Sequence, residues 1–213
     1  MGGILSALAG GIVQTVEITA VSFAVGAVLG LPLAMLRRAP FWLARLPAGA
    51  AIEIIRAVPP IVWLFIIYYA IGSGAVKLST FGAAVIGLGL ISAAHLAEIY
   101  RAGLNAIPAG QWDAVRATAL PGVAAYRHVI LPQAWVVVVP PMATYLIGLL
   151  KDSALASVIG AHDITFRAVE ETQQTLNGLG NFAVAGLLYI LLSVPVAIVA
   201  RVTDRRLTQR MTT

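Results

Sequence analysis

Five long stretches of the chain carry no charged side chain, and this pattern constrains the fold more than any other feature. The uncharged stretches are residues 18–36, 57–76, 81–97, 129–150 and 182–200. A helix that crosses a bilayer needs about 20 mainly apolar residues, and lipid leaves the backbone no partner outside the helix. The sequence therefore predicts an all-α integral membrane protein with about five transmembrane helices. The expected spans are residues 12–36, 50–76, 81–100, 129–150 and 182–201.

Composition supports a membrane environment. Hydrophobic residues make up 60% of the 213 positions and charged residues only 11%, against roughly 25% charged in ordinary soluble domains. A soluble domain of this size has too much surface for its volume to hide so many apolar side chains. We expect residues 1–213 to form one membrane domain.

The basic residues predict the orientation in the membrane. Eleven of the fourteen Lys and Arg residues would lie on one face if five spans are correct. These are Arg37, Arg38, Arg45, Arg56, Arg101, Arg116, Arg127, Arg201, Arg205, Arg206 and Arg210, whereas Lys77, Lys151 and Arg167 lie on the other face. Cytoplasmic loops carry the excess of positive charge, so we expect the N-terminus outside and the C-terminus in the cytoplasm. The net charge is +5, but the basic residues lie between apolar runs. This pattern is typical of membrane topology, so no nucleic-acid partner is expected.

Other site chemistries have little support. The chain has no cysteine, which excludes disulfides, thiolate metal ligands and thiol nucleophiles, and we expect no metal site. Two predicted loops, 101–128 on the inner face and 151–181 on the outer face, are too long to be simple connections. Loops of that length inside a compact domain usually carry function.

The inner loop is expected to contain a short helix across the cytoplasmic surface, between the third and fourth spans. Pro108 suits a first helical turn, and Pro121–Gly122 would end the helix. Trp112, Val115 and Ala119 recur at spacings that share one helix face. An interfacial helix with its Trp at the lipid headgroups is the alternative interpretation.

The same loop resembles the EAA motif of permease subunits of binding-protein-dependent ABC importers. That motif reads Glu-Ala-Ala, three residues, Gly, nine residues and Ile-x-Leu-Pro. Here the spacing is kept, with Asp113-Ala114-Val115, then Ala119, then Val129-Ile130-Leu131-Pro132. Four positions depart from the motif, and the Ala at the Gly position is the largest departure, because Gly permits a turn or a close approach.

Three further segments are similar to the polar amino acid branch of that family, which takes up His, Glu, Gln, Arg and opines. They are residues 55–69, 97–111 and 150–160. The resemblance implies a transmembrane subunit that imports a polar amino acid by alternating access. It implies as partners a dimer of ATPase subunits, a second permease subunit (identical or homologous) and an extracytoplasmic solute-binding protein, at the inner membrane of a prokaryote.

The resemblance also implies that ATP and Mg are bound by the partner subunits. The chain has no G-x-x-x-x-G-K-[ST] loop, so we expect no cofactor in this chain and no catalytic residues of its own. The residues expected to couple to the ATPase are Trp112, Asp113, Ala114, Val115, Ala119, Leu131 and Pro132.

Ionisable residues near a span are candidates for the substrate pathway. His95, Glu98 and Arg101 follow one another at three-residue spacing, so they share a helix face. The alternative is an ion pair between Glu98 and Arg101 that holds the loop at the inner interface. Lys151, Asp152 and Ser153 begin a segment that we expect to turn back toward the pathway as part of an outer gate.

Two other functions stay open. An ion-coupled secondary transporter or channel subunit would place charges at mid-span, whereas here they gather at span ends. A structural subunit of a membrane enzyme complex would offer paired His residues to haem or quinone, and the chain has only His95, His128 and His162.

Overall fold

The computed structural model describes residues 2–72, 77–118 and 121–212, with side chains of the last helix described as far as Thr203. Every regular element in these ranges is helical, which confirms the all-α class. The helices are α1 (Gly2–Ala9), α2 (Ile12–Arg37), α3 (Trp42–Ala57), α4 (Pro60–Phe65), η1 (Ile66–Ile71), α5 (Thr80–Asn105), α6 (Ala109–Ala117), α7 (Gly122–Ala125), η2 (Tyr126–Ile130), α8 (Leu131–Asp152), η3 (Ser153–Ile159), α9 (Ile164–Thr175) and α10 (Gly178–Thr212).

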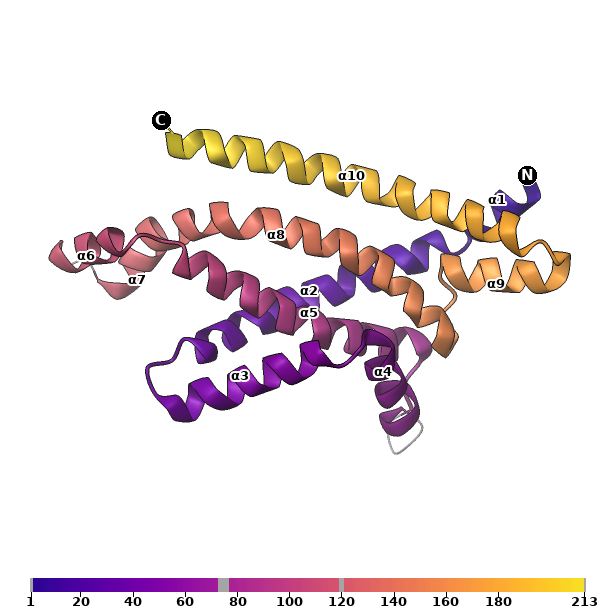
Figure 1. Ribbon diagram of the computed structural model, residues 1–213, viewed down its shortest axis with the longest axis horizontal. Helices are drawn as coiled ribbons and strands as arrows, with labels where there is room; N and C mark the ends of the chain where they lie inside the picture. Colours follow the sequence, from indigo (N-terminus) through magenta and orange to yellow (C-terminus); the bar gives the residue numbers. More distant parts are fainter. Residues whose placement is uncertain (1, 73–76, 119–120, 213) are drawn as a thin grey trace.

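The molecule is elongated, and its two ends differ. Helices α6 and α7 and the C-terminus gather at one end, whereas α1, α9 and the N-terminus lie at the other (Figure 1). Four continuous helical segments are long and apolar enough to cross a membrane. The bent pair formed by α3 and α4–η1 makes a fifth if it counts as one span, in agreement with the expected number.

Helices α2 and α5 form the centre of the fold and run side by side (Figure 1). Their contact is close because small residues line it. A Cβ added at Gly26 of α2 would lie 2.3 Å from the Cβ of Ser92 in α5. Apolar side chains such as Ile18 and Leu88 are fully buried in the adjoining core. Helix α8 packs against α5, and α10 packs against α8.

The second predicted span, residues 50–76, contains a sharp bend. Helix α3 ends at Ala57, and α4 leaves it at an angle of 100°. Val58 adopts an extended backbone because Pro59 disfavours the helical conformation of the residue before it. Pro60 then begins α4, and the Trp63 indole N–H donates to the Ile55 carbonyl across the bend at 3.0 Å.

The long segment between α8 and α10 is structured. The 3₁₀ helix η3 turns into the core, where Ala156 and Ile159 are buried beside Leu64 of α4 and Ala83 of α5. Helix α9 follows, capped by Asp163, whose carboxylate accepts from the Phe166 N–H at 2.8 Å. The backbone N–H of Ile164, the residue after Asp163, donates to the Thr15 hydroxyl of α2 at 3.1 Å.

Candidate coupling surface and translocation pathway

Helix α6 lies on the surface between α5 and α8, where the sequence predicted a short helix. Trp112 and Val115 are half-buried and pack on a cluster formed by Ile107, Ile130 and Ala134. The Trp112 ring also meets the Tyr126 ring edge-on, with centroids 5.7 Å apart. The face predicted from their spacing therefore fixes α6 to the protein. Ala119, the third residue of that face, lies outside the described residues.

The opposite face of α6 is open. Asp113 and Ala114 are both exposed, and the Asp113 side chain is 70% accessible although it pairs with Arg116 at 3.0 Å. An ion pair so exposed contributes little to stability. The two residues are therefore free to meet a partner surface, and the small Ala114 side chain allows another backbone to approach closely.

The first turn of α8 packs behind α6 and supports it. Gln133 donates to the Gln111 side chain at 3.1 Å, which joins the two helices across the loop. Leu131 and Pro132 begin α8 and are exposed beside this contact. A shift of α6 would therefore act on α8 through the Gln pair and the Trp112 packing.

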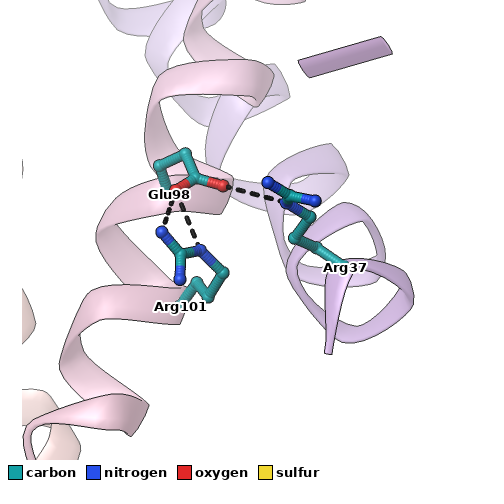
Figure 2. Close-up of polar contacts among 3 residues, drawn as sticks. All are labelled: Arg37, Glu98 and Arg101. Carbon is teal, nitrogen blue, oxygen red and sulfur yellow. Dashed lines mark hydrogen bonds and ion pairs between the residues drawn. The ribbon is translucent and has the colours of Figure 1, made fainter. Parts of the chain in front are cut away.

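Glu98 lies between two guanidinium groups in the C-terminal third of α5 (Figure 2). Its Oε2 accepts from Arg101 Nε at 2.8 Å, and its Oε1 lies 3.8 Å from Nε of Arg37 in α2. The Glu98 side chain is only 16% exposed. The ion pair predicted between Glu98 and Arg101 is present, and Arg37 extends it into a link between α2 and α5.

His95 does not join this ion network, although it lies three residues from Glu98. Its ring stacks on Tyr145 of α8 with centroids 5.0 Å apart. The Tyr145 hydroxyl shares a hydrogen bond of 2.9 Å with the buried Ser92. The predicted face of α5 therefore splits into an aromatic–hydroxyl contact with α8 and a charged contact with α2.

Lys151, Asp152 and Ser153 point into different surroundings. Ser153 is fully buried, and its hydroxyl donates to the Leu150 carbonyl at 2.7 Å. Lys151 is exposed and lines a cavity of about 410 Å³ between α8 and α10, together with Tyr189 and Ser193. Asp152 is half-buried between them.

Three residues of these contacts were not singled out from the sequence as site candidates. Arg37 was used only to predict the orientation in the membrane, and Tyr145 and Ser92 were assigned no role. Ser92 and Tyr145 stand 53 residues apart, a separation that no helical periodicity links. The one available signal was the polar character of Ser92 and Tyr145 within otherwise apolar spans.

These features describe a multi-pass helical membrane protein that offers a short surface helix between two of its spans. The family model of the binding-protein-dependent transport system inner membrane component matches residues 26–209. The chain belongs to this family, and it is a permease of the ABC importer type. That membership excludes the secondary-transporter and enzyme-subunit interpretations.

Individual relatives agree with this assignment. The probable amino-acid ABC transporter permease protein y4tG of Sinorhizobium fredii is 32% identical over 97% of this chain and 90% of its own length. The arginine transport system permease protein ArtQ of Bacillus subtilis is 33% identical over 92% of this chain and 90% of its own. A chain in the crystal structure of an amino acid ABC transporter with histidines is 29% identical, with a TM-score of 0.88 and 94% of each chain covered.

Proposed function

We propose that this permease imports a polar amino acid delivered by an extracytoplasmic solute-binding protein, and that α6 is its contact with the ATPase subunits. The observation that carries the proposal is the two-sided character of α6. One face is anchored through Trp112, whereas Asp113 and Ala114 on the other face are exposed. The names of the relatives support the substrate class, since both are amino-acid permeases.

The mechanism follows from what α6 touches. ATPase closure would pull α6, and the Trp112 packing and the Gln111–Gln133 contact would pass that movement to α8. Helix α8 carries Tyr145, which meets His95, and Lys151, which lies in its last turn. Rigid-body rocking of helices of this kind alternates access between the two faces. ATP and Mg would be held by the partner subunits alone, and this chain would carry neither cofactor nor catalytic residue.

The outer half of the pathway is assigned to the neighbourhood of Lys151. Lys151 borders the cavity between α8 and α10 with Tyr189 and Ser193. The ammonium group of a lysine suits the carboxylate of an amino acid. The gate role of Asp152 and Ser153, and any direct role of Glu98 in transport, are part of the same proposal.

Orientation completes the proposal. The face that carries α6 would be cytoplasmic and the face that carries α9 would be outside, so the N-terminus lies outside and the C-terminus inside. The second permease subunit, identical or homologous, would close the pathway from the other side. The excess of Arg at the α6 end of the spans supports this arrangement.

Affinity purification of the tagged chain in mild detergent tests the ATPase contact. We expect an ATPase subunit to co-purify with the unmodified chain and to be lost from Ala114→Trp, because a large side chain would separate the two surfaces. Gln174→Trp places the same bulk on the exposed part of α9 and should retain the ATPase. Full ATPase retention by Ala114→Trp in a folded chain would refute the proposed contact.

The substrate class needs its own measurement. The purified complex, reconstituted in proteoliposomes with its binding protein, should accumulate a labelled polar amino acid only when ATP is present. Equal accumulation without ATP, or transport of apolar amino acids alone, would contradict the proposal.

A further inference from the structure

A second open groove lies at the α6 end of the molecule, away from the Lys151 cavity. It has a volume of about 470 Å³ and is bounded by α2, α5 and the α7–η2 segment. Its walls include Leu31, Met35, Leu104 and Val123. The Tyr100 hydroxyl at its edge already donates to the Ala27 carbonyl at 3.2 Å. The interior of the groove is therefore apolar.

The deeper part of the groove, at Leu31, lies within a helix long and apolar enough to cross a membrane. Leu31 lies six residues before Arg37 at the end of α2, which corresponds to about 9 Å of helix. Leu31 and Leu104 both belong to helices of membrane length and hydropathy. Met35 and Val123 are largely exposed on the groove wall, at 72% and 82%.

Two arginines at this end of the molecule have no carboxylate partner among the described side chains. Arg127 itself lines the groove. The Arg38 guanidinium lies 5.8 Å from the centre of the Trp112 ring, which meets Tyr126 on the groove wall. Within the described ranges, every ion pair involves other cations, and the Nη1 atom of Arg38 is buried without a hydrogen-bond partner.

We propose that this groove binds one anionic phospholipid. An acyl chain fills the apolar walls between α2 and α7, and the phosphate lies at the rim served by Arg127 and Arg38. Cationic residues beside an apolar groove between spans match both parts of such a lipid. The bound lipid would wedge between the spans and the α7–η2 segment that supports α6. The inference needs only that the chain lies in a bilayer, and it does not depend on the substrate or on the ATPase contact.

Native mass spectrometry of the purified complex, delipidated and titrated with phosphatidylglycerol, tests the site. We expect one tightly retained phosphatidylglycerol per copy of this chain and weaker retention of zwitterionic phosphatidylcholine. Arg127→Gln should weaken phosphatidylglycerol binding about fivefold, and Arg38→Gln with Arg127→Gln about 25-fold. Arg127→Lys should keep most of the affinity, because the charge remains.

Arg45→Gln provides the matched control. It removes an exposed arginine of α3 that lines no part of the groove, so phosphatidylglycerol binding should be unchanged. Equal binding by Arg127→Gln and the unmodified chain, or equal loss in Arg45→Gln, would overturn the proposal.

A photoreactive benzoylphenylalanine at position 123 reports the occupant directly. A lipid adduct in native membranes supports the proposal. An adduct with a second permease copy or with another protein would show that the groove is a protein interface and would refute it.

Discussion

At the scale of single residues, Glu98 links two helices through its charge. It is the one carboxylate in the described part of the chain that meets two arginines, on two different helices. Glu98→Gln should lower the stability of the purified complex by about 2 kcal/mol, because a largely buried charge-assisted hydrogen bond is lost while both cations remain. The thermal unfolding midpoint measures this change.

Glu170→Gln is the control for that prediction. Glu170 makes the same (i, i+3) pair with Arg167, but its side chain is 45% exposed. Its loss should change stability by less than about 0.5 kcal/mol. Equal shifts of the unfolding midpoint for the two variants would show that the Glu98 contact between α2 and α5 contributes no more to stability than the exposed pair. Unchanged uptake per assembled complex in Glu98→Gln would give Glu98 a structural role only.

Asp163 is the second residue with a measurable signature. Burial raises the pKa of its carboxyl group to about 6, against the opposing effect of hydrogen bonds from Phe166 N–H and the Tyr189 hydroxyl. The folded state therefore holds a proton between about pH 4 and 6 that the unfolded state releases. Stability should fall as pH rises through this window, by up to about 1.4 kcal/mol per pH unit.

Asp163→Asn isolates this effect. Asn keeps a side-chain oxygen for the helix cap but does not titrate. We expect the stability of the variant relative to the unmodified protein to increase as pH rises from 4 to 6, measured by unfolding at each pH. A difference that stays constant across the window would place the carboxyl pKa near its ordinary value.

At the scale of helices, the close contact of α2 and α5 depends on residues without side chains. A Cβ at Gly26 would lie 2.3 Å from Ser92 Cβ and 2.8 Å from its backbone carbon, so neither side can yield without moving a helix. Gly26→Ala should destabilise the complex by about 1–3 kcal/mol through overpacking. Unfolding by denaturant measures the loss.

Gly148→Ala in α8 is the matched substitution. A Cβ at Gly148 meets nothing within 4 Å, and Ala is favoured over Gly inside a helix by about 1 kcal/mol. Its stability should be unchanged or slightly higher. A loss equal to that of Gly26→Ala would mean that helix packing at α2–α5 is looser than its geometry indicates.

The positions of the helices show which helix bounds the sequence predicted and which it did not. Helix α2 (Ile12–Arg37) begins and ends within a residue of the predicted range, and α6 lies inside the predicted loop. The two prolines at positions 59 and 60 signal a break in the second span but not its angle of 100°. That angle is set by Leu64 and Ile67 of the α4–η1 segment packing on α5.

At the scale of the whole molecule, the absence of cysteine in the sequence makes topology directly testable. Leu176→Cys places a thiol at a position that is 90% exposed near α9, and Ala109→Cys places one at the exposed start of α6. We expect a membrane-impermeant maleimide to label position 176 in intact cells and position 109 only after the membrane is opened. The reverse pattern would invert the proposed orientation.

The sequence by itself determined that the chain is a helical membrane protein, where most of its spans lie and which loop resembles the EAA motif. Each of these depends on local composition or spacing, because whether a segment spans the bilayer depends mainly on its own length and hydrophobicity. Only the tertiary structure decided that Arg37 reaches Glu98, that Tyr145 joins His95 and Ser92, and that η3 is buried. These contacts join residues that are far apart in sequence, and in lipid, where exposed apolar faces carry little penalty, close packing selects them.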